Sequence, residues 1–265
     1  MTPGRCKLCD QKGNLVESDI WPRFGYKLYA ADQAQGGVFA DLKELKIHGK
    51  RYTEPLFCQK CDNETLSQHE MKAADWCRAY DKTPESPRDY GAWLLPFLTS
   101  LSLRTVLNRS NPTTDEARYG PAIRHWRHFL LMKRRDVLPF SQHLFIVFDR
   151  ELGSHQGMCG WCPKKRFVFT QFGPLWIVAL LERGNLSHGD LRAWDHSQIS
   201  SEGGTIEPVK AWHEGTTITT ELLNFLFERR QAIFRKAAHS ERRKKNGSKR
   251  RSAEANNQVL RCAAA

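Results

Sequence analysis

The chain has 265 residues, of which 40% are hydrophobic, so it is long enough to bury a core, as one small and one larger domain. Its mean hydropathy is −0.59 and no apolar run reaches the ~18 residues that span a bilayer, so we expect no contact with a membrane. The net charge of +12 favours an anionic partner, most simply nucleic acid.

Two Cys-x-x-Cys pairs, Cys6 with Cys9 and Cys58 with Cys61, stand about fifty residues apart in the N-terminal region. Two intervening residues let both thiolates of a pair reach one tetrahedral Zn²⁺ from a tight knuckle. A single pair is also typical of redox motifs, whereas two pairs in one block indicate a structural site. Because the N-terminus shows no signal-peptide core, we expect the reducing cytoplasm, where cysteines bind metals or stay thiols. The sequence therefore predicts one Zn²⁺ bound by these four cysteines.

A zinc module is expected over residues 1–82. Short strands are predicted at 15–20 and 52–57, and a helix begins near Asp62. A knuckle, a hairpin and a second knuckle at a helix start occur in this order in a treble clef or a ββα-metal finger. The stretch 82–87 is polar and rich in proline, which indicates a domain boundary.

The second domain is expected over residues 88–238, with helices within 93–136, strands within 144–182 and a final helix over 219–238. Thr113 and Glu116 have the spacing of a capping box that opens the second of these helices. The last two strands join at Gly173-Pro174 as a hairpin. Residues 185–210 are polar and predicted to be rich in loops, and 239–265 form a basic tail that we expect to be disordered. The predicted fold class is α+β, a zinc-bound treble-clef module followed by a helical and antiparallel β domain.

Basic residues gather on the helix after the capping box and in the tail. The window 235–251 holds nine cations and one acid, and thereby contributes +8 of the net charge. Such segments favour nucleic acid, although a solvated helix face and a solubilising tail have the same composition. The candidate nucleic-acid-binding residues are Arg23, Arg124, Arg127, Lys133, Arg134, Arg135, Arg242, Arg243, Lys244, Lys245, Lys249, Arg250 and Arg251.

A third pair, Cys159 and Cys162, shares the spacing of a thioredoxin motif. In thioredoxins the pair opens a helix, whereas here Pro163 leads directly into a predicted strand. We therefore expect a β-turn that carries two thiols, as a metal knuckle without its partner.

The first predicted strand continues as Ser18-Asp19-Ile20-Trp21-Pro22, and the second knuckle is followed by Asp62. These motifs resemble the Ser-His-Ile-Ile-Pro strand and the Leu-Leu-Cys-x-x-Cys-acid knuckle of the HNH-like endonucleases of bacteria and phages. Residues 101–104 are similar to the Ser-Leu-Trp-Arg segment of that family, and the region around Gly215 fits it too. The resemblance implies an HNH-like module and a metal-dependent phosphodiesterase that acts on DNA, in an anti-phage system.

In that family a histidine at the end of the first strand activates water beside one divalent cation. This chain has Asp19 there, and a carboxylate with an ordinary pKa of ~3.9 is a poor base and a good metal ligand. The resemblance thus implies that Asp19 and Asp62 bind a catalytic Mg²⁺ or Mn²⁺, with His69 or His48 as the replacement base. The alternative is a capping carboxylate at Asp19 and ordinary surface histidines.

Three functions are therefore left open by the sequence. The first is the DNA endonuclease. The second is a catalytically inactive zinc-finger relative that binds nucleic acid or a protein partner, for example in a defence complex. The third is a protein-interaction module. Asp19 discriminates between them, because a histidine at that position would favour the nuclease.

Overall fold

The computed structural model describes residues 1–29, 39–41, 46–48, 52–80, 86–108, 115–148, 157–162, 167–172, 175–181, 198–206 and 208–210. The predicted helix over 219–238, the basic tail over 239–265 and the region around Gly215 lie outside these residues, as does Thr113 of the capping box. No helix in the described part of the chain is both long and apolar enough to cross a membrane.

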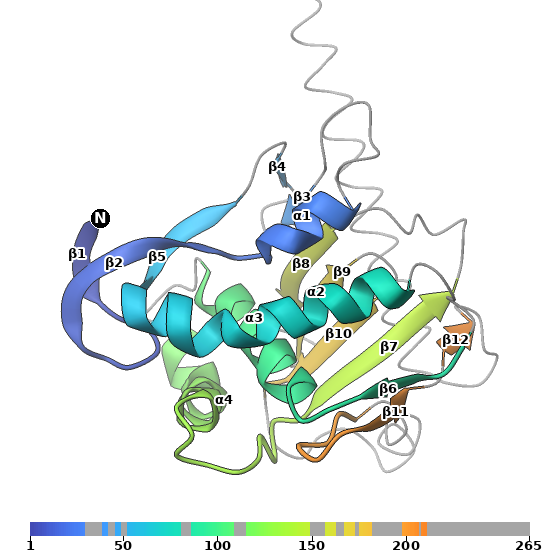
Figure 1. The fold of residues 1–265 in the computed structure, drawn as a ribbon. Coiled ribbons are helices and arrows are strands. Elements are labelled where there is room, and N and C mark those ends of the chain that lie inside the picture. Colours follow the sequence, from blue (N-terminus) through green and yellow to red (C-terminus); the bar gives the residue numbers. More distant parts are fainter. Residues whose placement is uncertain are drawn as a thin grey trace, which may run out of the picture.

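The N-terminal region combines a small antiparallel sheet with helices (Figure 1). The sheet has the order β1-β2-β5, and its strands are β1 (Thr2–Arg5), β2 (Lys12–Asp19) and β5 (Thr53–Cys58). The helices that follow these strands are α1 (Arg23–Tyr29), the π-helix η1 (Cys61–Leu66) and α2 (Gln68–Tyr80). The predicted strands and the helix that starts near Asp62 are confirmed.

A seven-stranded sheet forms the second layer, in the order β12-β7-β10-β9-β8-β3-β4. Its neighbours are antiparallel except for the parallel pairs β12–β7 and β3–β8. The strands are β3 (Phe39–Asp41), β4 (Lys46–His48), β7 (Gln142–Phe148), β8 (Gly157–Cys162), β9 (Phe167–Phe172), β10 (Leu175–Leu180) and β12 (Pro208–Lys210). The predicted hairpin is confirmed, because β9 and β10 pair from Phe172 and Leu175 onwards.

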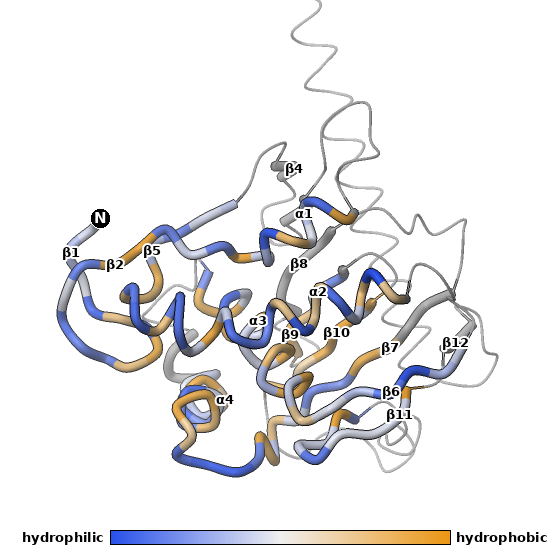
Figure 2. Tube along the Cα trace, viewed as in Figure 1, coloured by the Kyte–Doolittle hydropathy of each residue, from blue (hydrophilic) through white to orange (hydrophobic). Residues whose placement is uncertain are grey.

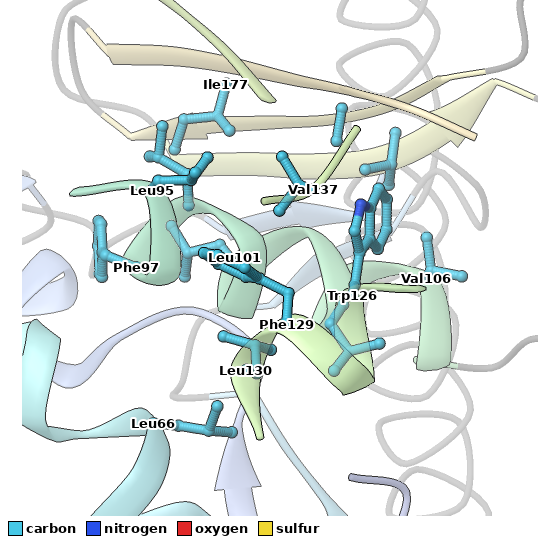
Figure 3. Packing of buried hydrophobic residues seen from close by; sticks show 14 of the residues in the cluster. Leu66, Leu95, Phe97, Leu101, Val106, Trp126, Phe129, Leu130, Val137 and Ile177 are labelled. Atoms are coloured by element: carbon cyan, nitrogen blue, oxygen red, sulfur yellow. The ribbon is translucent and has the colours of Figure 1, made fainter. Parts of the chain in front are cut away.

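Helix α3 (Leu94–Leu107) lies at the centre of the hydrophobic core, and all of its residues except Pro96 and Leu107 are buried. Because α3 presents no exposed polar face, the rest of the protein must cover it on every side. Figure 3 shows Ile177 of the sheet on one side of α3 and Phe129 of α4 (Asp115–Leu130) on the other. Figure 2 shows hydrophobic colour along much of α3 and hydrophilic colour on the turn that leads from the first knuckle into β2.

Two sequence predictions were wrong. Helix α4 ends at Leu130 rather than at 136, because Met132 adopts a left-handed φ of 58° that terminates the helix. Cys159 and Cys162 lie in β8 rather than in a turn, because β8 pairs with β9 along its whole length. The stretch 185–210, predicted to be rich in loops, also contains the short strands β12 and β11 (Gly204–Ile206), and β11 pairs with β6 (Arg88–Tyr90).

The expected zinc module and the second unit pack together closely. Strands β3 and β4 belong to the first, yet β3 pairs with β8 of the second. One continuous cluster of buried residues extends from Cys6 to Ile206. The fold is therefore α+β, and the two expected units share one sheet and one core.

Candidate metal centre

The four cysteines predicted to bind zinc meet at one point. Their Sγ atoms all lie within 4.8 Å of one another, and those of Cys9 and Cys58 are 3.9 Å apart. A tetrahedral zinc ion with Zn–S bonds of about 2.3 Å would place its sulfurs about 3.8 Å apart. The cluster could therefore bind a metal ion such as zinc. Within the described ranges, no other group of three or more His, Cys, Asp or Glu side chains is placed to hold an ion.

Backbone hydrogen bonds shape the first knuckle and join it to the second. The N–H of Asp10 donates to the carbonyl of Cys6 at 3.0 Å, and Asp10 adopts a left-handed φ of 67° that turns the chain back. The N–H of Lys7 donates to the carbonyl of Leu56 in β5 at 2.9 Å. The N–H of Cys58 points at Sγ of Cys6 at 3.3 Å. Pairing of β2 with β5 therefore delivers both knuckles to one place.

The thiols of the cluster oppose one another's ionisation. Burial alone would raise the pKa of Cys6, but hydrogen bonds from the backbone of Cys58, Cys9 and Leu8 lower it to about 7. Burial raises the pKa of Cys61, and the charge of the Cys6 thiolate raises it further. Burial likewise raises the pKa of Cys9. A divalent cation would remove this conflict, because it stabilises all four thiolates together.

Arg127 connects helix α4 to the first knuckle. Its Nε donates to the carbonyl of Leu8 at 2.8 Å, and its Nη2 lies 3.9 Å from Oδ1 of Asp10. Leu8 stands between the two cysteines of the knuckle, so this arginine supports the metal centre directly. The sequence placed Arg127 among the nucleic-acid-binding residues and did not indicate this contact.

The remaining predicted nucleic-acid-binding residues fall into two groups. Those within the described residues are all exposed, namely Arg23, Arg124, Lys133, Arg134 and Arg135. Those of the tail lie outside the described residues, namely Arg242, Arg243, Lys244, Lys245, Lys249, Arg250 and Arg251.

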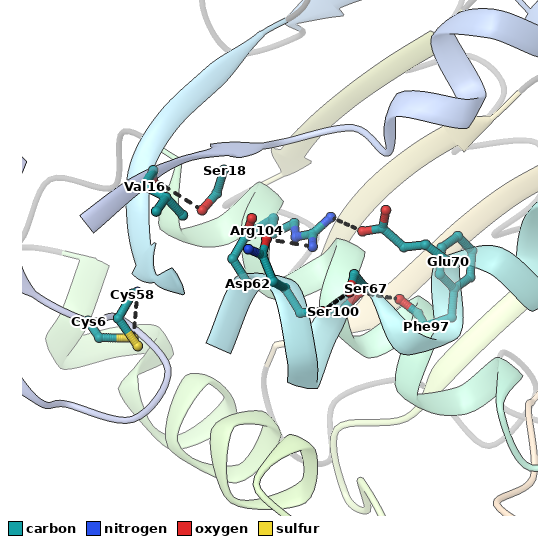
Figure 4. A network of polar contacts seen from close by, with 11 residues as sticks. Cys6, Val16, Ser18, Cys58, Asp62, Ser67, Glu70, Phe97, Ser100 and Arg104 are labelled. Carbon is teal, nitrogen blue, oxygen red and sulfur yellow. Dashed lines mark hydrogen bonds and ion pairs between the residues drawn. The ribbon is translucent and has the colours of Figure 1, made fainter. Parts of the chain in front are cut away.

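Asp62, the predicted ligand of a catalytic cation, faces a buried arginine (Figure 4). Only 2% of Arg104 is exposed, and its Nη1 lies 2.7 Å from Oε1 of Glu70 while its Nη2 lies 4.0 Å from Oδ1 of Asp62. Arg104 thereby ties α3 to η1 and α2. Arg104 is the one charged residue of α3, whose other residues are apolar or carry hydroxyl groups. A single arginine in such a helix is a sequence signal for an internal ion pair.

Asp19 and His69 are the other two residues that the sequence predicted for the catalytic site. The register of β2 against β5 shifts between Val16 and Glu17, and Ser18 is then fully buried on the side that faces Arg104 (Figure 4). Because side chains alternate along a strand, Asp19 points to the other face. Burial, and then the charge of Lys72, lowers the pKa of His69, which favours its neutral form.

The structure therefore does not gather Asp19, Asp62 and His69 into one group that could hold an ion. Of the alternative base, His48, the structure describes the backbone in β4 and not the side chain.

No protein-family model, curated protein or solved structure matches this chain. The resemblance to the HNH-like endonucleases consequently depends on the sequence motifs alone.

Proposed function

We propose that this protein is a zinc-stabilised nucleic-acid-binding protein that does not hydrolyse the nucleic acid it binds. In this proposal, Zn²⁺ joins the two knuckles of a treble-clef module that is related to the HNH-like endonucleases. Four cysteine donors support a structural role for the ion, because they fill its coordination shell and leave no position for water or substrate.

Nucleic acid is the partner that the charge of the chain supports. The net charge is +12, and the predicted basic residues of α4 and of the loop after it are exposed, apart from the half-buried Arg127. Cations that neutralise phosphates release condensed counterions from the nucleic acid, which is a large favourable term at low salt.

The proposal that the protein does not hydrolyse nucleic acid is supported by the ion pairing of Arg104 with Glu70 and Asp62. A guanidinium stays protonated at any physiological pH, so Arg104 is a permanent positive charge in the place where a cation was expected. A Mg²⁺ or Mn²⁺ ion bound to Asp62 would be repelled by that charge. These residues do not fit a catalytic divalent cation, and we assign no step of a hydrolytic reaction to them.

The competing hypothesis is the metal-dependent DNA endonuclease implied by the sequence motifs. It requires Asp62 to leave Arg104 and to meet Asp19 at one ion. A protein partner in a defence complex is compatible with either hypothesis.

The experiment is to mix zinc-loaded protein with supercoiled plasmid, linear DNA and RNA, in Mg²⁺ or Mn²⁺. We expect complexes in a gel-shift assay and no nicking over several hours. Nicking that disappears in Asp62→Asn, but persists in the exposed control Asp75→Asn, would restore the endonuclease. Failure to bind any nucleic acid at low salt would remove the proposed partner.

A further inference from the structure

Exposed cations from two distant parts of the sequence meet beside the metal centre. Lys7 lies in the first knuckle, Arg124 lies on α4, and three more cations follow the end of α4. We define the knuckle–α4 surface as the exposed residues Lys7, Arg124, Lys133, Arg134 and Arg135.

The hydrogen bond from Arg127 to Leu8 fixes the two parts of this surface against each other. Lys7 directly precedes Leu8, and Arg124 lies one helical turn before Arg127. The three cations after the helix begin within two turns of Arg127, where the N–H of Lys133 donates to the carbonyl of His128 at 2.8 Å. The surface therefore has a fixed shape that depends on a correctly formed knuckle.

Asp10 and Asp136 lie near the surface, and each has a positive or polar partner within the protein. Asp10 lies 3.3 Å from Nη1 of Arg5 and 3.9 Å from Nη2 of Arg127. Oδ1 of Asp136 lies 3.9 Å from Nε2 of the buried His125. The five exposed cations therefore leave the surface strongly positive.

The other features of the surface point to phosphates rather than to lipid or to unstacked bases. The apolar face of α4, which includes Trp126, Phe129 and Leu130, is buried in the core and cannot insert into a bilayer. The exposed large apolar side chains of the described residues are Met1, Met71, Met132 and Leu138, and none of them is aromatic. Proteins that prefer single strands stack bases on aromatic rings, and this surface offers none.

We propose that the knuckle–α4 surface binds the phosphate backbone of double-stranded nucleic acid. This inference rests on the proposed function and adds the site and the form of the partner. From Arg124 to the end of α4 is about 9 Å, over which a duplex presents about five phosphate charges. A duplex therefore offers more charge along this length than a single strand does. Because the knuckle carries Lys7, bound zinc should be required for full affinity.

The test compares two full-length double variants that change the net charge equally. Lys7→Glu with Arg124→Glu alters the proposed surface, and Lys27→Glu with Lys72→Glu alters exposed lysines of α1 and α2. Binding is measured by fluorescence anisotropy on duplex DNA, duplex RNA and single-stranded DNA of equal length, from 50 to 300 mM salt. Each variant is first checked for zinc content and melting temperature.

We expect the surface variant to bind duplexes about tenfold or more weakly at 0.1 M salt, and the control variant to bind nearly as wild type does. The slope of log affinity against log salt should fall by about 0.9 for each lost phosphate contact on DNA. The deficit should vanish at high salt, which a misfolded variant would not show. Wild type should bind duplex DNA and duplex RNA more tightly than single-stranded DNA. Comparison of the two duplexes shows whether the protein favours DNA or RNA.

Equal losses in both variants would overturn the inference and leave the proposed function intact, because binding would then follow net charge or the tail. A preference for the single strand would overturn it too, as would equally tight competition by polyglutamate or by anionic vesicles. Absence of nucleic-acid binding in wild type would instead overturn the proposed function itself.

Discussion

Two partly buried polar clusters begin at adjacent residues of this protein, and they balance their charges in different ways. Cys61 points into the cysteine cluster, while Asp62 points to Arg104. The cysteine cluster contains four thiols that become anions when they bind a metal ion. The carboxylate cluster contains its own cation, since Arg104 lies 2.7 Å from Glu70.

The first two residues of η1 therefore belong to two different clusters, because Cys61 lies in the cysteine cluster and Asp62 lies beside Arg104. If the cluster binds zinc as proposed, the thiols take their cation from outside the chain, and folding around them would depend on the metal. The carboxylates of Asp62 and Glu70 are balanced by a side chain that folding itself delivers from α3. A cation-dependent site and a cation-independent site can therefore lie one residue apart, and the following experiments separate them.

Loss of a zinc ligand should have the largest effect. Cys58→Ser leaves three thiols and opens the centre, and structural zinc contributes ~10–16 kcal/mol to the folding of zinc-finger peptides at neutral pH. We expect loss of bound zinc and unfolding of the β1-β2-β5 sheet, measured by metal analysis and circular dichroism. Cys77→Ser is the matched control, because Cys77 is buried but lies outside the cluster. Full zinc content in Cys58→Ser would contradict the site.

Removal of the internal cation should have the next largest effect. Arg104→Leu leaves the half-buried Asp62 and Glu70 without their partner, and because breaking a fully buried pair typically costs ~3–5 kcal/mol, we expect a smaller loss here. Urea unfolding of the zinc-loaded protein measures this loss. Arg78→Leu is the control, because Arg78 pairs with Asp75 at the surface, where ion pairs contribute about 0–1 kcal/mol.

A triple variant tests in a second way whether Asp62 and Glu70 depend on Arg104. Replacing Arg104, Asp62 and Glu70 together by leucine removes the two half-buried carboxylates along with their partner, and much of the lost stability should return. If Arg104→Leu alone were as stable as wild type, the carboxylates would not depend on that arginine.

The metal centre was predictable from the sequence, because the spacing of cysteines within a knuckle follows from the geometry of one ion. The hairpin at Gly173-Pro174 was predictable for a similar reason, since its signal is local. Helix α3 was visible as a long apolar run, although its central position depends on the sheet that covers it.

The errors concern interactions between distant residues. Cys159 and Cys162 were expected in a turn, but pairing with both β9 and β3 makes the segment a strand. The contact of Arg127 with Leu8 spans more than a hundred residues and has no local signal. Asp62 was interpreted from its neighbours in the sequence, whereas its surroundings are set by Arg104 of a different helix.

A smaller effect is expected from His69, which lies next to the carboxylate cluster. Burial and the charge of Lys72 lower its pKa below the ordinary value of 6.5, so the unfolded chain binds a proton more readily than the folded protein. The contribution of His69 to stability is therefore complete above pH 6.5 and is lost as the pH falls toward its folded pKa. His69→Gln should reduce the fall in stability below pH 6.5, measured by urea unfolding between pH 5 and 8. An unchanged pH profile would contradict this role.

The smallest expected effect belongs to Asp19→His, which restores the residue that the HNH-like motif has at this position. Because Asp19 and the buried Ser18 point to opposite faces of β2, and Asp62 faces Arg104, the new imidazole would not meet a bound cation. Wild type, Asp19→His and Asp19→Ala should be equally inert on DNA and RNA in Mg²⁺ or Mn²⁺. General-base assistance is worth ~10²–10⁴ in rate, so a working base would be evident in a plasmid-nicking assay. Cleavage by Asp19→His, absent from Asp19→Ala, would show that Asp62 can leave Arg104 for a metal ion. In that case the carboxylate cluster, like the cysteine cluster, would accept a cation from outside the chain.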